Sequence, residues 1–500
     1  MKNNFSLNLL SSLLVICLST VALQKHVLAT PLFTNSRWIV DEDGNRVKLA
    51  CVNWPDHLQP AVAEGLSKKP VDVISEKIRS MGFNCVRLTW PLALINNHTL
   101  ASMTVENSFK SLGLYESLGG IKVNNERFLN MSLSQVFKNV VSSLGDNNIM
   151  VILDNHITTP GWCCSNNDSS AFFGDKDFDP KLWIKGLGRM ATMFKGTKNV
   201  IGMSLRNELR GPNQNVKAWY RYMQRGAEAV HAANPEVLVV LSGLYFDTDL
   251  SFLRKKQVKV SFTKKLVFEG HWYAFTENAT AWVESNHNDY CGIFMNNIQN
   301  NYTFLLKQGY PVFLGEFGTD QTGLNENGNR FFNCILGFIA DWDMDWSLWA
   351  LQGSYYLRGG VYAMDETYGL LSYDWESVRN SSYLRRLQAV QSPFQGVGLG
   401  LPPRLGNDCT NSSSKWEMIS NSRMHLSSEL ASGERVCLDV SKDGTIITNQ
   451  CKCLAKDPKC DPTISYMAER VVGHGSVGIV FQIFRPLATW LSMLLGMDHV

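Results

Sequence analysis

The sequence has no block of like charge and, beyond its N-terminus, no long apolar run. The formal net charge is only +2 over 500 residues and the Lys and Arg residues are scattered, so nothing indicates a nucleic-acid-binding surface. No later apolar run reaches the roughly 18 residues that a membrane-spanning helix needs, so we expect no stable membrane span. No HExxH-like spacing of His and carboxylate residues is present, and we expect neither a metal nor another cofactor.

The N-terminus has the pattern of a targeting segment. Lys2 precedes the apolar stretch "LNLLSSLLVICLSTVAL", and small residues offer cleavage after Ala22 or Ala29. We expect a secretory signal peptide over 1–29, the alternative being an uncleaved anchor. Secretion makes the N-x-S/T sequons relevant as glycosylation sites. They lie at Asn97, Asn130, Asn167, Asn278, Asn301, Asn380 and Asn411.

Cysteine usage is consistent with a secreted protein. Of 12 Cys, Cys17 lies in the signal segment, which leaves an odd number and therefore at least one unpaired thiol or intermolecular bond. We expect disulfides in a secreted, extracellular glycoprotein, and a monomer.

Eight short apolar runs recur between residues 46 and 353, near 50, 87, 152, 203, 240, 269, 314 and 348. Helical patterns separate several of them, such as "VDVISEKIRSM" before Gly82 and "VKAWYRYMQRGAEAVHAANP". Continuous apolar strands alternating with helices favour parallel strands that are buried on both faces. We predict a (β/α)8 TIM barrel over 30–392. An open doubly wound sheet is the alternative, disfavoured because no Gly-rich turn follows the first strand.

The ends of the apolar runs carry polar or aromatic residues, where a barrel of this type builds its active site. "SLRNELRG" is one example: three costly polar groups, Arg206, Asn207 and Glu208, close an apolar strand. The full set of such residues is Arg87, His156, Asn207, Glu208, His271, Tyr273, Glu316 and Trp349.

Glu208 and Glu316 are three βα units apart and can face each other across the barrel mouth. Such a pair suits a retaining glycosidase, in which one carboxylate attacks the anomeric carbon and the other acts as acid and then base. The simpler alternatives are that Glu208 pairs with the neighbouring Arg206 or Arg210 and that His156 is a core residue.

The segments "CVRLTW", "LDNH", "LRNELRG", "GHWY", "LGEFG" and "SLWALQG" resemble, in this order, glycoside hydrolase family 5, the cellulase family of clan A. The resemblance implies that Glu208 is the acid/base and Glu316 the nucleophile in retaining hydrolysis of a β-linked glycan. "NWPDHLQPAV" and "DNHITTPGWCC" are similar to a plant subgroup with a small lectin-like tail.

The remaining six strand-end residues are assigned to substrate binding and support. Candidate sugar-stacking aromatics are Trp54, Trp90, Trp162 and Trp272. Asp56, His57, Asp154 and Glu269 are further residues that could line the cleft.

The C-terminal part differs in character. Residues 393–408 read as a Pro/Gly-rich linker. "VCLDV…GTIITNQCKC" within 409–463 resembles one repeat of a ricin-type lectin, so we expect a small, incomplete β-trefoil-like region. Cys437 can pair with Cys451 or Cys453, with a zinc site as the alternative.

We interpret residues 464–500 as a foreign or disordered tail. It contains "GHGSVGIV", which resembles the Gly-rich loop of glycogen-synthase-kinase-type protein kinases. No catalytic kinase motif follows, so we predict no phosphoryl transfer. The sequence thus predicts a hydrolase acting on cellulose, β-glucan or mannan, and the alternative is an inactive carbohydrate-binding protein.

Overall fold

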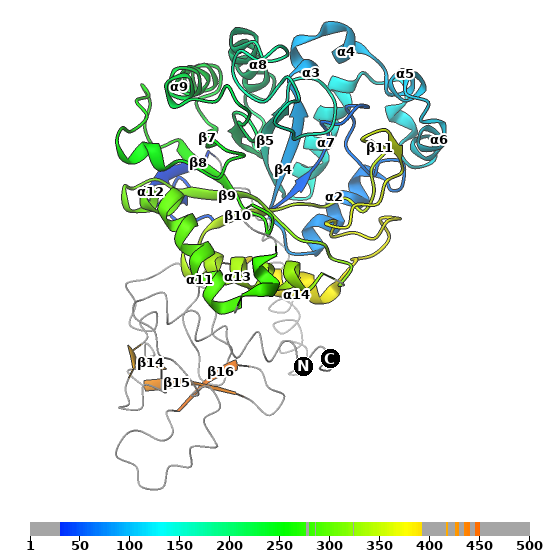
Figure 1. The fold of residues 1–500 in the computed structure, drawn as a ribbon. Helices are drawn as coiled ribbons and strands as arrows, with labels where there is room; N and C mark the ends of the chain where they lie inside the picture. Colours follow the sequence, from blue (N-terminus) through cyan, green and yellow to red (C-terminus); the bar gives the residue numbers. More distant parts are fainter. Residues whose placement is uncertain are drawn as a thin grey trace, which may run out of the picture.

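The computed structural model describes residues 31–276, 280–285, 287–323 and 325–392, together with four short strands nearer the C-terminus. Eight parallel strands close into one barrel in the order β10-β3-β4-β5-β6-β7-β8-β9 (Figure 1). The predicted barrel is confirmed, and every apolar run singled out in the sequence is one of its strands. They are β3 (Ala50–Trp54), β4 (Cys85–Pro91), β5 (Met150–Ile157), β6 (Val200–Ser204), β7 (Leu238–Leu241), β8 (Leu266–His271), β9 (Val312–Phe317) and β10 (Asp345–Leu348).

Strand alternation divides the barrel interior into an apolar floor and a polar upper layer. Successive side chains of a strand point to opposite faces, so Cys85 and Arg87 of β4 both point inward while Val86 and Leu88 pack against the helices. Cys85 lies in the floor and forms a disulfide with its register neighbour Cys51 on β3. Arg87 therefore enters the interior one step nearer to the carboxyl ends of the strands.

Amphipathic helices surround the barrel. Gly82, with a φ of 90°, follows the first of them, and Asn215 caps the longest by accepting a hydrogen bond from the backbone of Ala218. Both helices that the sequence pattern predicted are present. The main helices are α2 (Val71–Ser80), α7 (Leu133–Asp146), α8 (Pro180–Met193), α9 (Val216–Ala233), α11 (His287–Ile298), α13 (Glu326–Asp341) and α14 (Ser381–Gln388).

Two insertions follow strand ends and extend the face of the barrel that carries the site. The first lies between β4 and α7 and contains four short helices; the second follows β10 and forms a hairpin. No described helix is long and apolar enough to cross a membrane. The inserted elements are α3 (Ala93–Asn96), α4 (His98–Ser102), α5 (Val105–Ser111), α6 (Tyr115–Asn124), β11 (Leu357–Arg358) and β12 (Val361–Tyr362).

Four antiparallel strands form a separate small sheet in the predicted lectin-like region. The predicted signal peptide (1–29), linker (393–408) and tail (464–500) lie outside the described residues. The strands of the small sheet are β13 (Glu417–Met418), β14 (Leu426–Glu429), β15 (Arg435–Val440) and β16 (Ile446–Gln450).

Candidate active site

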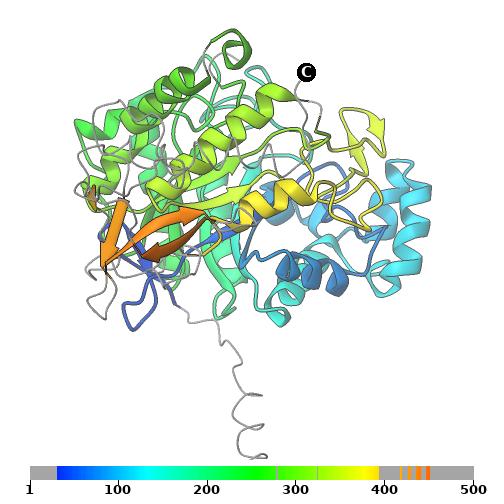
Figure 2. The ribbon, with the colours of Figure 1, turned by 90° about the horizontal axis from the view of Figure 1, so that it is seen from below.

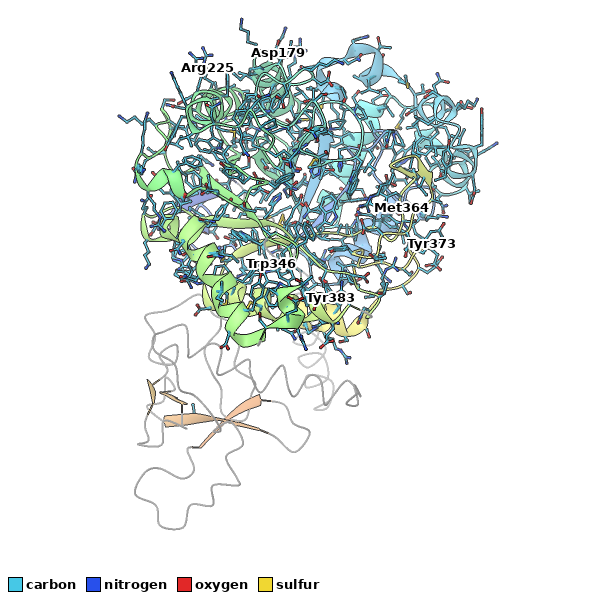
Figure 3. All side chains as sticks on the ribbon, in the orientation of Figure 1. Asp179, Arg225, Trp346, Met364, Tyr373 and Tyr383 are labelled. Atoms are coloured by element: carbon cyan, nitrogen blue, oxygen red, sulfur yellow. A yellow bond between two sulfur atoms is a disulfide. The ribbon has the colours of Figure 1, made fainter. Side chains whose placement is uncertain are left out.

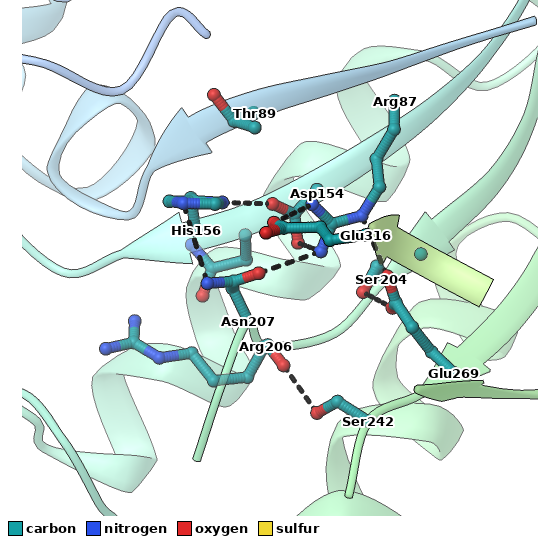
Figure 4. Close-up of polar contacts among 12 residues, drawn as sticks. Arg87, Thr89, Asp154, His156, Ser204, Arg206, Asn207, Ser242, Glu269 and Glu316 are labelled. Atoms are coloured by element: carbon teal, nitrogen blue, oxygen red, sulfur yellow. Dashed lines mark hydrogen bonds and ion pairs between the residues drawn. The ribbon is translucent and has the colours of Figure 1, made fainter. Parts of the chain in front are cut away.

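Arg87 is the centre of a buried polar network at the carboxyl ends of the strands (Figure 4). Its guanidinium lies 2.9 Å from Oε1 of Glu316, 3.0 Å from Oδ1 of Asp154 and 2.8 Å from Oε1 of Glu269. It also donates hydrogen bonds of 2.9 Å to the side-chain oxygens of Asn53 and Asn207. One cation thus holds side chains from several strands, and its planar fork can do this because it presents several donors in fixed directions.

Glu316, on β9, has a hydrogen-bond donor at each carboxylate oxygen. Arg87 donates to Oε1, and the Tyr273 hydroxyl donates to Oε2 over 2.8 Å. Burial raises the pKa of Glu316 to about 7, whereas His271, Arg87 and the Tyr273 hydrogen bond act against this rise. The donors thereby fix the orientation of the Glu316 carboxylate. The carboxylate also needs them in order to be ionised near neutral pH.

Glu208 follows β6 in a left-handed backbone conformation, with a φ of 45°. Such a conformation is unfavourable for a residue with a Cβ, and the surrounding contacts must hold it. The backbone N–H of Glu208 donates to Oδ2 of Asp247 over 3.1 Å, and Oε1 lies 3.2 Å from Nδ1 of His271. The side chain keeps 14% of its surface exposed, so a substrate can reach it.

The alternative that the Glu208 carboxylate pairs with its neighbouring arginines does not hold, and the only Glu208 atom to which Arg210 donates is the backbone oxygen. Arg210 pairs with Asp168, and Arg206 donates to the backbone oxygen and hydroxyl of Ser170. The two arginines bind the loop that follows β5 and leave the Glu208 carboxylate to face the cleft. Figure 4 shows Arg206 directed away from the Arg87 cluster.

His271 connects the two glutamates. Its Nδ1 lies 3.2 Å from Glu208 and 3.7 Å from Oε2 of Glu316, and its Nε2 faces Glu269 at 3.3 Å. Burial alone would lower the pKa of His271, but the carboxylates, Glu316 and Asp247 foremost, raise it well above its usual value. A protonated His271 donates on both nitrogens and keeps the two carboxylates at a fixed separation.

His156 and Trp349 form the opposite wall. The two rings stack at 5.6 Å with an angle of 17°, and Nδ1 of His156 lies 2.6 Å from Asp154. Burial and then Arg87 lower the pKa of His156 well below its usual value, so the ring is neutral. Its Nε2 lies 3.5 Å from the Asn207 amide, which orients that amide beside Glu208.

The eight predicted strand-end residues therefore come together in one site. Comparisons with known proteins show the family of the chain. The family model described as "Cellulase (glycosyl hydrolase family 5)" matches residues 40–354. The chain belongs to glycosyl hydrolase family 5. It is 38% identical over 535 aligned residues to a "Glycosyl hydrolase 5 family protein" of Chamaecyparis obtusa, covering 92% of this chain and 95% of that protein. It is 22% identical to an "Endoglucanase" of Paenibacillus polymyxa, covering 68% of this chain and 82% of that protein.

Solved structures share the barrel. The catalytic domain of the major endoglucanase of Xanthomonas campestris aligns with a TM-score of 0.57 and 20% identity, over 71% of this chain and 99% of that one. An endocellulase of Pyrococcus horikoshii in complex with cellotetraose aligns with a TM-score of 0.58 and 18% identity, over 73% of this chain and 100% of that one. At these identities the likeness establishes the fold.

The candidate stacking tryptophans separate into two groups. Trp54, Trp90 and Trp272 are only 0%, 0% and 2% exposed, so the expectation of a solvent-facing platform is not met at these positions. They pack in the core, and the Trp54 indole N–H donates to the backbone oxygen of Glu64. Trp162 is 36% exposed and lies under the Arg358 guanidinium at 3.6 Å. Position in the sequence could not distinguish an exposed sugar-stacking tryptophan from a buried core tryptophan, because residues of both kinds lie near the same end of the barrel.

Sequence reasoning missed Asp247 and the adjacent cysteines. Asp247 lies six residues beyond the end of β7, outside the strand ends that were considered, yet it accepts from the Glu208 backbone. Cys163 and Cys164 form a disulfide beside the site, and Sγ of Cys164 lies 3.5 Å from the Asn207 amide nitrogen. The run "WCC" after the third strand was the available signal.

Three residues of the site carry atoms that could bind a metal ion. Glu208, His271 and Glu316 present ligand atoms within 4.8 Å of one another. A metal needs a neutral imidazole, whereas the four surrounding carboxylates keep His271 protonated. The donor set therefore fits a carboxylate pair with a bridging cationic donor better than a metal centre.

Proposed function

We propose that this family 5 protein is a retaining hydrolase of β-linked glucan, in which Glu316 is the nucleophile and Glu208 the acid/base. The observation that carries the proposal is the separation of the two carboxylates: one oxygen of Glu208 lies within 4.8 Å of one oxygen of Glu316. Retaining glycosidases hold their pair roughly 5–5.5 Å apart, whereas inverting enzymes leave about 6.5–9.5 Å for a water.

The assignment of roles follows from the environment of each glutamate. Glu316 is buried and oriented by Arg87 and Tyr273, which favour the charged form that attacks the anomeric carbon. Glu208 is partly exposed, so it can reach the leaving oxygen, give it a proton and then accept one from water. Asn207, held between Arg87 and His156, is suited to bind a sugar hydroxyl at the reacting ring.

The choice of β-glucan over mannan rests on the relatives named endoglucanases, and endo action is part of the same proposal. We also propose that the protein is secreted and glycosylated. The three disulfides among the described residues support secretion, because such bonds persist in oxidising compartments.

The test is release of reducing sugar from β-glucan, β-mannan and xylan polymers by the wild type, Glu208→Ala and Glu316→Ala. Release from β-glucan that is lost in both variants is the expected result. A 2-fluoro glycoside should label Glu316 covalently, as found by peptide mass spectrometry. A wild type that binds cello-oligosaccharides but releases no sugar and is not labelled would show a carbohydrate-binding protein instead.

A further inference from the structure

A pocket of about 470 Å³ lies between α6, the loop after β3 and the β11–β12 hairpin. The catalytic glutamates are not among its lining residues. The residues that line the pocket belong to three chain segments, which follow the carboxyl ends of β3, β4 and β10. The pocket therefore lies on the face of the barrel that carries the active site. The yellow hairpin lies beside the cyan helices in both views of the fold (Figures 1 and 2).

The rim of the pocket carries large exposed side chains on rigid supports. Tyr115, on α6, is 67% exposed, and Tyr362, on β12, is 60% exposed. The Tyr362 hydroxyl donates to the backbone oxygen of Leu112 over 3.3 Å, which fixes the hairpin against the turn before α6. Lys68 also lines the pocket, and its Nζ lies 5.6 Å from the ring centre of Tyr373, which is 43% exposed and stands outside the lining. Figure 3 shows Met364 and Tyr373 on this flank of the molecule.

The floor adds a polar group with free hydrogen-bonding capacity. Glu64 is 1% exposed and lines the pocket. Its Oε2 accepts a 2.7 Å hydrogen bond from the backbone of Tyr356, whereas its Oε1 has no hydrogen-bond partner among the described residues. A buried carboxyl oxygen without a partner is costly, and a ligand hydroxyl that reaches it would remove that cost.

The pocket is connected to the active-site cleft through ring contacts. Tyr355, in the pocket lining, meets Trp162 edge-to-face at 5.9 Å, and the Arg358 guanidinium covers Trp162. Trp162 immediately precedes Cys163 and Cys164, which lie beside Asn207. Two aromatic rings and the adjacent disulfide therefore connect the pocket with Asn207 in the site.

We propose that this pocket is an accessory glycan-binding site, which holds a distant part of a β-linked glucan chain while another part lies at Glu208 and Glu316. Exposed tyrosine rings match the apolar faces of pyranose rings, and Glu64 and Lys68 match their hydroxyl groups. The ligand class rests on the proposed function, but the pocket is a separate site. Its contribution is to the affinity for long chains.

The experiment compares Tyr115→Ala/Tyr362→Ala with Tyr115→Phe/Tyr362→Phe, which keeps both rings. Each is assayed on an aryl cellobioside, too short to reach the pocket, and on soluble β-glucan, and each is run through a native gel containing β-glucan. We expect the alanine pair to retain the short-substrate rate within about twofold, to raise KM for the polymer about fivefold or more, and to lose gel retardation. The phenylalanine pair loses the Tyr362–Leu112 hydrogen bond as the alanine pair does, but it keeps both rings, so it should retain the polymer KM and the gel retardation.

Equal polymer kinetics and equal retardation for the alanine pair would overturn the proposal. If no variant hydrolyses either substrate, the proposed function fails, and gel retardation still decides the pocket. The alternative occupant of the pocket is a second copy of the chain, which sedimentation velocity detects as self-association. Self-association that is lost in the alanine pair while gel retardation stays unchanged would also overturn the proposal. Matching thermal unfolding of the variants confirms that they are folded.

Discussion

The hydroxyl of Tyr273, which follows β8, lies 2.8 Å from Oε2 of Glu316. Arg87, on β4, donates to the other oxygen, Oε1. The two donors occupy opposite oxygens of one carboxylate, so neither can replace the other. The Glu316 carboxylate is therefore oriented by side chains from two strands at once, and we expect that removing one donor changes both its position and its pKa.

Tyr273→Phe tests this arrangement. Loss of the hydrogen bond should raise the pKa of Glu316, which burial already places at about 7, because the hydroxyl stabilises the charged form. Activity requires ionised Glu316 and falls as the pH drops through that pKa, so the acidic limb of kcat/KM should move to higher pH. We expect kcat/KM at pH 6 to fall about tenfold or more, with a smaller loss at pH 8.

The control is Tyr383→Phe. Tyr383 is also buried, but its ring stacks on Phe332 with 3.9 Å between the ring centres, and it does not contact Glu208 or Glu316. Its pH profile should coincide with that of the wild type. An unmoved acidic limb in Tyr273→Phe would show that the hydroxyl does not govern Glu316.

Arg87→Met should lower the free energy of unfolding by about 3 kcal/mol or more at pH 8, because it leaves three buried carboxylates without their cation. Burial already raises the pKa of Asp154 to about 7, and loss of Arg87 would raise it further. A raised pKa in the folded state favours the protonated form, and that stabilisation is lost as the pH rises. The deficit should therefore be smaller at pH 5 than at pH 8, as measured by urea unfolding.

Arg386→Met is the matched control for that measurement. Arg386 is also largely buried, but its partners are the neutral side chains of Asn329 and Asn333. Its deficit should not depend on pH in this range. A pH-independent deficit in Arg87→Met would contradict the role of Arg87 as the counterion of the cluster.

Glu208→Ala should distinguish the acid/base from the nucleophile. Removal of the acid should lower the rate on cello-oligosaccharides about 1000-fold, but only slightly slow the first step with a good leaving group such as dinitrophenolate. Azide can then occupy the vacated space and attack the glycosyl-enzyme. We expect faster turnover with azide and a β-glycosyl azide product, identified by NMR.

Glu316→Ala provides the comparison for the azide experiment. It lacks the nucleophile, so azide should give no β-glycosyl azide through a glycosyl-enzyme. The opposite pattern, with the β-product from Glu316→Ala, would exchange the two roles.

The double variant Cys51→Ser/Cys85→Ser should reduce stability without reducing kcat. The disulfide closes a segment of 34 residues between β3 and β4, and in the chain-entropy description its loss costs about 3–4 kcal/mol. Both cysteines lie in the apolar floor of the barrel, away from the catalytic layer. Guanidinium unfolding and initial rates at 25 °C measure the two effects, and a kcat loss with unchanged stability would contradict this separation.

The sequence by itself determined the barrel and most of the site. The apolar runs became the strands because parallel strands that are buried on both faces must be apolar throughout, and the polar residues at their ends could only meet at one mouth. Glu208 and Glu316 were therefore recognisable together with the six residues that surround them.

Only the tertiary structure decided what depends on distance and burial. It showed that Arg210 turns to Asp168 and leaves Glu208 to His271, that Trp54 and Trp90 are core residues whereas Trp162 is exposed, and that Asp247 reaches the site from a loop. The carboxylate separation and the pocket beside the β11–β12 hairpin likewise depend on insertions and side-chain directions. The physical reason is that strand periodicity determines at which end of a strand and on which face of the sheet a residue lies. Contacts between segments far apart in the chain determine its side-chain partner and its exposure to solvent.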